Sequence, residues 1–87
     1  RMRIQEAIRH LMKEQHVTLE AMGERMGGIT KMAVHGALNG KKQKSMSVDR
    51  AVCFLDKLGY EMVAVPKGSR LPNGSMAIEA AGGGSDD

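Results

Sequence analysis

The chain has 87 residues, of which 41% are hydrophobic and 26% charged, and its formal net charge at pH 7 is +3. That length suits one small domain, and the sequence has no apolar run near the roughly 18 residues that a membrane-spanning helix needs. A single cysteine, Cys53, excludes an intramolecular disulfide. We therefore expect a cytoplasmic protein. Because aromatic residues make up only 2% of the chain, its core should be built from aliphatic residues and methionine.

The first part of the chain predicts two amphipathic helices. Residues 2–15 carry apolar side chains at spacings of three and four, the period of one helix face, at Ile4, Ala7, Ile8, Leu11 and Met12. Thr18 offers a hydroxyl N-cap for a second helix over residues 19–26, in which the apolar positions are Leu19, Met22 and Met26. Gly27 and Gly28 then predict a sharp turn, because glycine adopts the positive φ that such turns require.

Two further helices are expected after this turn. Thr30 is the predicted N-cap of a third helix, which ends at Asn39-Gly40, a pair suited to the left-handed conformation that follows many helices. Its expected core positions are Ala33, Val34, Ala37 and Leu38. Ser47 caps a fourth helix, which Gly59 ends. The apolar residues of this fourth helix predict a wide buried face made of Val48, Ala51, Val52, Phe54, Leu55 and Leu58.

Residues 60–65, YEMVAV, change the pattern, because they are rich in β-formers and are followed by Pro66. A single strand needs a partner for its backbone groups. The partner is either the segment 75–79, reached through a hairpin, or the same strand of a second copy. We favour the second copy, because apolar residues on both faces of the strand predict burial on both sides. The expected dimer contacts are Tyr60, Met62, Val63 and Val65.

Together these elements predict a fold that is mainly all-α. We expect a four-helix domain over residues 1–59, a short β-strand for dimerisation over residues 60–66, and a flexible tail over residues 67–87. The tail prediction rests on its end, AAGGGSDD, which is small, polar and rich in glycine.

The basic residues are concentrated in one stretch. No acidic residue lies between Glu24 and Asp49, whereas this stretch contains Arg25, Lys31, His35, Lys41, Lys42 and Lys44. Such a stretch predicts a face that binds a polyanion, although a solvated lysine loop without a partner would show the same composition. Lys31 favours the first interpretation. The positive end of a helix disfavours a cation unless an external anion, such as a phosphate, lies beside it.

Three stretches carry a resemblance to a known family. The first stretch is TLEAMGERMG. It contains Gly23, at a position where a small residue lets two helices touch, and Gly27, a turn glycine. The second and third stretches are ITKMAVHGALNG and SVDRAVCFLDKLGY. In this order they resemble the first motif helix, the recognition helix and the following helix of the Cro and C1 repressor class, the XRE family of helix-turn-helix proteins. The resemblance covers residues 4–59. LGYEMVAVPKGSRLP is similar to the tail of small phage and prophage regulators of this class.

The resemblance implies a transcriptional regulator, most simply a repressor. Such a protein binds a pseudo-palindromic site on double-stranded DNA as a homodimer, in a bacterium or a phage-infected host. The third helix would enter the major groove, and the lysines after it would hold phosphates. The DNA-binding residues expected on this basis are Thr30, Lys31, Met32, His35, Gly36, Asn39, Lys41, Lys42 and Lys44.

Two departures from the family pattern leave a second interpretation open. Gly28 lengthens the turn by one residue. The third helix also exposes Lys31, Met32, His35 and Gly36 where the family usually offers Gln, Ser, Arg or Asn. The alternative is a protein-interaction module, for example a phage inhibitor of a host protein, that uses this helix against a protein partner.

Other kinds of chemistry find no support in the sequence. The three histidines share no metal-ligand spacing, and Cys53 stands alone. No P-loop, GxSxG motif or catalytic carboxylate pair is present. We therefore predict no enzymatic activity, no cofactor and no metal ion.

Overall fold

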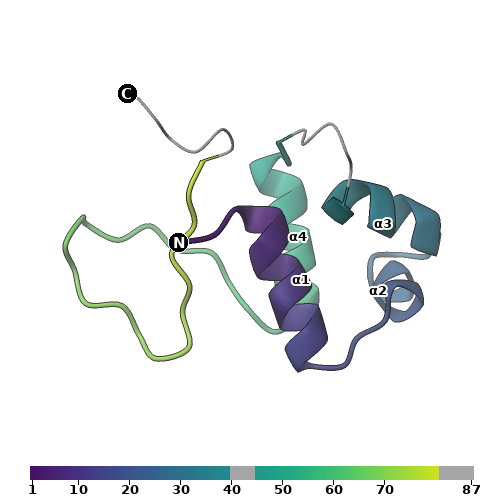
Figure 1. Ribbon diagram of the computed structural model, residues 1–87, viewed down its shortest axis with the longest axis horizontal. Coiled ribbons are helices and arrows are strands. Elements are labelled where there is room, and N and C mark those ends of the chain that lie inside the picture. Colours follow the sequence, from purple (N-terminus) through teal and green to yellow (C-terminus); the bar gives the residue numbers. More distant parts are fainter. Residues whose placement is uncertain (40–44, 81–87) are drawn as a thin grey trace.

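Figure 1 shows the computed structural model, which describes residues 1–39 and 45–80. Within these residues four helices follow one another: α1 (Ile4–Glu14), α2 (Leu19–Arg25), α3 (Lys31–Asn39) and α4 (Val48–Lys57). Each begins and ends within two residues of a helix predicted from the sequence, so the mainly α-helical fold class is confirmed. α3 packs against α2 and α1, and α1 packs against α4. We call residues 4–59 the helical body and residues 60–80 the C-terminal segment.

Three hydroxyl side chains cap helix starts, at the positions that the sequence predicts. The Oγ1 atoms of Thr18 and Thr30 each accept a hydrogen bond from the N–H three residues later, at 3.0 and 3.1 Å. The Oγ atom of Ser47 does the same for α4, at 3.1 Å. Each bond satisfies a backbone donor that has no acceptor inside its own helix, and so fixes the residue at which the helix begins.

α1, α2 and α4 end in the same backbone arrangement, the Schellman motif, in which two N–H groups after the helix donate back to carbonyls of its last turn. The motif needs one residue at positive φ. Gly27 provides it after α2 and Gly59 after α4, with φ of 99° and 81°. After α1 this residue is His16, with φ of 58°. A side chain there occupies a conformation that favours glycine.

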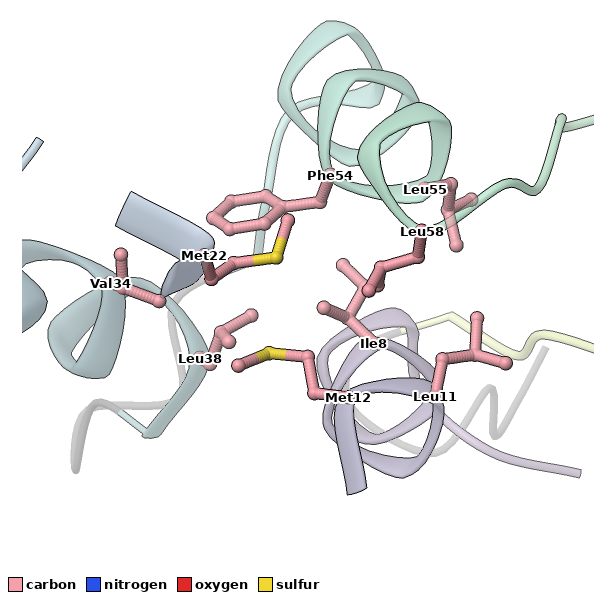
Figure 2. Close-up of a cluster of buried hydrophobic side chains, with 9 residues drawn as sticks. All are labelled: Ile8, Leu11, Met12, Met22, Val34, Leu38, Phe54, Leu55 and Leu58. Carbon is pink, nitrogen blue, oxygen red and sulfur yellow. The ribbon is translucent and has the colours of Figure 1, made fainter. Parts of the chain in front are cut away.

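The core lies between the four helices (Figure 2). Phe54 of α4 is completely buried, and its ring points toward Met22 of α2. Ile8 of α1 is also completely buried and points toward α4. The cluster consists of Ile8, Leu11, Met12, Met22, Val34, Leu38, Phe54, Leu55 and Leu58. Burial of this apolar surface is the main term that holds the helices together.

The apolar faces predicted for the third and fourth helices are too wide. Val48 and Val52 of α4 are 66% and 41% exposed, and Ala33 of α3 is exposed as well. The described chain covers each helix mainly on one side. Residues a quarter turn or more from the centre of that side therefore remain in solvent, even though they are apolar.

The strand predicted at residues 60–66 does not form in the single chain, nor does the hairpin with residues 75–79. No described segment pairs with either through a strand ladder. Instead, Met2 and Ile78 form an isolated parallel bridge through two backbone hydrogen bonds of 3.2 and 2.9 Å. A high β-propensity cannot by itself produce a strand, because the backbone groups need a partner.

The C-terminal segment makes a loop beside the helical body (Figure 1). The hydroxyl of Tyr60 donates a hydrogen bond to the carbonyl of Gly74 at 3.3 Å and so joins the two ends of this loop. Met76 then packs against the core of the helical body. The segment predicted as a single flexible tail therefore includes residues that contact the body, whereas residues 81–87 lie outside the described part of the chain.

Two identical turns shape this loop. In each, a serine N–H donates to a proline carbonyl three residues earlier, Ser69 to Pro66 at 3.2 Å and Ser75 to Pro72 at 3.1 Å. The glycine at the third position of each turn has φ of 84° or 86°, as a type II turn requires. The repeated sequence P-x-G-S is the signal that predicts both turns.

Candidate nucleic-acid interface

The entry into α3 is held by close backbone packing. Gly23 is buried in α2, and its carbonyl accepts hydrogen bonds from the N–H groups of Gly28 and Ile29, at 2.9 and 3.1 Å. A Cβ atom on Gly23 would lie 2.3 Å from the carbonyl oxygen of Ile29, a distance that real Cβ contacts do not reach. The absence of a side chain at Gly23 therefore sets how closely the residues leading into α3 approach α2.

One side of α3 is anchored in the molecule. Val34 and Leu38, one helical turn apart, are buried in the core, and Ala37 beside them is partly buried. At the far end of the helix, the guanidinium of Arg9 in α1 donates a hydrogen bond to the carbonyl of Leu38. A cation at this position also complements the negative end of the α3 dipole. These contacts fix the orientation of α3, so the opposite side has a defined position.

The remaining surface of α3, together with Thr30 just before it, is exposed, and we call this surface the outer face. It includes six of the residues that the sequence predicts for DNA binding, together with one that it does not, and all seven are exposed: Thr30, Lys31, Met32, Ala33, His35, Gly36 and Asn39. α3 lies at the edge of the molecule, at the far side from the C-terminal segment (Figure 1). The structure thus brings these predicted residues together on one accessible surface.

Ala33 is the residue of the outer face that the helix pattern of the sequence predicts, wrongly, to be in the core. Successive residues of an α-helix are about 100° apart, so Ala33 points well away from the Leu38 direction. A helical projection centred on Val34 and Leu38 is the signal that would have placed it correctly.

The start of α3 is favourable for an anion. The first N–H groups of a helix have no acceptor within it. Thr30 Oγ1 accepts the N–H of Ala33, which leaves the N–H groups of Lys31 and Met32 directed out of the helix. No acidic residue lies in this first turn, and the side chain of Lys31 is exposed there. Backbone dipoles and the ammonium group therefore act with the same sign.

The remaining cations of the basic stretch do not add to the outer face as the structure describes it. Lys41, Lys42 and Lys44 lie outside the described residues. Arg25 does not belong to the outer face: its guanidinium donates to the carbonyl of Lys57 at 3.0 Å, at the C-terminal end of α4. There its charge complements the α4 dipole and links α2 to α4. Arg25 belongs to the basic stretch for which the sequence predicts polyanion binding, but this contact gives it a role in joining two helices.

The residues predicted as dimer contacts are largely uncovered in the single chain. Met62, Val63 and Val65 are 41%, 64% and 45% exposed. Tyr60 is partly buried and packs against the core. One chain alone therefore does not cover this segment, and the predicted covering by a second copy stays a prediction. An open hollow separates the segment from the first turns of α1 and α4, and Val48 is one of the residues that line it.

The described residues contain no group of three or more His, Cys, Asp or Glu side chains that could hold a metal ion. In the same part of the chain, no helix has the length and apolar character to cross a membrane. Cys53 is exposed on α4. Comparison of the chain with protein-family models, with curated proteins and with solved structures finds no match.

Proposed function

We propose that this protein is a DNA-binding transcriptional regulator that uses α2 and α3 as a helix-turn-helix. The observation that carries the proposal is the outer face of α3. The helix is anchored by Val34 and Leu38, while its exposed first turn carries Lys31 at the positive end of the helix. In helix-turn-helix proteins the second helix lies in the major groove and its N-terminal residues contact the bases.

Phosphate contacts would come from the same end of α3. The free N–H groups of Lys31 and Met32 can donate to a phosphate oxygen, and the Lys31 ammonium adds a charge-assisted bond. The lysines predicted to follow the helix, Lys41, Lys42 and Lys44, would extend this contact along the DNA backbone. Such contacts position the protein, whereas base contacts give it sequence preference.

A homodimer is part of this proposal. The segment 60–66 lies outside the helices and is rich in β-formers, and Val63 and Val65 are exposed in the single chain. Pairing of this segment with its copy would bury these side chains and satisfy the backbone groups. Two copies of α3 would then lie about 34 Å apart, one turn of the DNA helix, and read a pseudo-palindromic site. A dimer bound at a promoter would block transcription, which makes a repressor the simplest regulator.

A salt titration tests DNA binding. We expect the protein to bind a random-sequence duplex in fluorescence anisotropy, with an affinity that falls as salt rises. Neutralisation of one phosphate contributes about −0.9 to the log–log slope, so roughly three contacts in each subunit of a dimer predict a slope of about −5. A slope near zero, or no binding at low salt, would remove the proposal.

A pair of charge reversals locates the interface. Lys31→Glu should weaken DNA binding by about tenfold or more, because it places a carboxylate beside the phosphate. Lys67→Glu is the matched control, since Lys67 lies in the C-terminal segment, away from α3, and both side chains are exposed. Equal losses for the two variants would contradict the assignment of the outer face.

The dimer has its own test. Val63→Asp should convert the protein to monomers in sedimentation velocity, because a carboxylate would be buried in the paired strands. Val63→Thr, which keeps the β-branched shape, should remain dimeric. A dimer that persists in the Asp variant would exclude this segment as the interface.

A second candidate is the protein-interaction module. One observation favours it: Met32, on the outer face, is 73% exposed, and methionine is common on adaptable protein-binding surfaces. The titration separates the two functions. A module that binds only protein would show no salt-dependent binding to duplex DNA, while its outer face would still be available to a protein partner.

A further inference from the structure

Met32 lies near the middle of the outer face of α3, and no side chain stands one turn further along the helix from it. Its exposed fraction, 73%, is the highest among the large apolar side chains of the described residues. The next residue on the same row, four positions on, is Gly36, and a Cβ atom there would meet nothing within 4 Å. The fold gains nothing from this glycine, which costs a helix stability relative to alanine. The row is therefore an apolar side chain followed by a bare backbone.

The polar residues of the outer face lie around this row. Lys31 is at the start of α3 and Asn39 is at its last position, so between them His35 is the single side chain able to form hydrogen bonds. The middle of the face thus has no amide or guanidinium for bidentate pairing with adenine or guanine. Hydrogen bonding alone gives this helix little power to distinguish base pairs.

We infer that Met32 reads thymine through its C5-methyl group, and that Gly36 lets α3 approach the floor of the major groove closely enough for this contact. The methyl group is the one apolar feature that the bases present in that groove. The thioether side chain of Met32 is flexible and polarizable, and it can pack on such a group without losing a hydrogen bond. This inference rests on the proposed function, because it requires α3 in the major groove.

The expected size of the effect follows from the apolar group removed. Deleting one buried methyl group weakens an apolar contact by about fourfold in affinity. A symmetric dimer touches the same position in both half-sites, so removal of both methyl groups should weaken binding by about fifteenfold.

The experiment uses the full-length protein and a duplex selected for tight binding from a randomised library. Each thymine of that duplex is replaced in turn by deoxyuracil, which removes only the methyl group, and the dissociation constant is measured by anisotropy. We expect a loss of about fourfold at one thymine of each half-site. Replacement of that thymine by cytosine should be partly rescued by 5-methylcytosine, which restores the methyl group on a different base.

Protein variants assign the effect to Met32. Met32→Ala should bind the thymine and the deoxyuracil duplexes equally. Val48→Ala is the control, because Val48 is exposed to a similar degree, 66%, and lies on α4; this variant should keep the full preference for thymine. Circular dichroism of both variants should match the parent protein, since neither side chain is buried.

The possible outcomes are separable. If the selected duplex binds but no thymine is sensitive to loss of its methyl group, methyl readout is wrong and the proposed function stands. The inference is also overturned if Met32→Ala keeps the thymine preference. If no duplex is bound at low salt, the proposed function itself fails and the inference fails with it.

Discussion

In the helical body each helix buries apolar side chains against another helix, whereas in the C-terminal segment apolar residues such as Val63 and Val65 face solvent in the single chain. The body also satisfies its own helix ends through caps and Schellman motifs. The C-terminal segment is held by turns, by one side-chain bond of Tyr60, by a bridge to Met2 and by the packing of Tyr60 and Met76 against the core. The difference indicates that the body is stable through its own contacts, while the exposed part of the segment is suited to covering by a partner.

The largest difference between the two regions should come from removal of a buried ring. Phe54→Ala should lower the free energy of unfolding by about 3–5 kcal/mol, because it leaves a cavity in the centre of the core. Val63→Ala should change it by less than about 0.5 kcal/mol at concentrations where the protein is monomeric. Urea denaturation followed by circular dichroism measures both. Similar losses would mean that the segment belongs to the same cooperative core.

A pair of glycine substitutions compares how the backbones of the helical body and of the C-terminal segment tolerate an added side chain. Gly23→Ala should lower the free energy of unfolding by about 1–3 kcal/mol, since the new Cβ would collide with the Ile29 carbonyl. This loss occurs although alanine favours helices by about 1 kcal/mol. Gly68→Ala introduces strain at a φ of 84° in the exposed loop, where a Cβ would meet nothing within 4 Å.

We expect the strain at Gly68 to change the loop and to leave thermal unfolding of the body nearly unaltered. The comparison would fail if Gly68→Ala lowered the melting temperature as much as Gly23→Ala does.

The smallest expected effect is a gain in the stability of the helical body. His16→Gly should raise the free energy of unfolding by about 1 kcal/mol, because glycine adopts the φ of 58° observed at His16 with less strain. In a domain of this size that corresponds to about 4–8 °C in melting temperature. Gly59→Ala is the inverse change at the equivalent position after α4, and it should lower the melting temperature. No gain at His16 would mean that its side chain makes a compensating contribution.

The sequence predicts most of the helical body because the relevant signals are local. The caps Thr18, Thr30 and Ser47 and the glycines after α2 and α4 act on backbone groups a few residues away, so their effect can be read from spacing alone. The exposed residues of α3 that the sequence proposes for DNA binding are also exposed in the structure, since helix periodicity determines which side faces outward. Whether they bind DNA is a separate question, which the titration addresses.

The remaining features depend on contacts between distant parts of the chain. The guanidinium of Arg9 bonds to the carbonyl of Leu38, and Arg25 bonds to that of Lys57; neither pairing has a pattern in the sequence. The strand at residues 60–66 does not form within one chain, because β-propensity describes how side chains fit a sheet and does not supply the neighbouring strand; its pairing with a second copy stays a prediction. The bridge between Met2 and Ile78 joins the two ends of the described chain and has no local signal.

The buried and the exposed residues of α3 differ in what they contribute to the fold, and this difference determines which of them can be substituted. Val34 and Leu38 secure the helix, while Met32 and Gly36 touch nothing that the fold depends on. Exchange of the outward residues should therefore carry little penalty in folding and, under the proposed function, would alter the preferred DNA site. Natural divergence could retarget the molecule in this way, and an engineer could use the same four helices as a scaffold for new specificities.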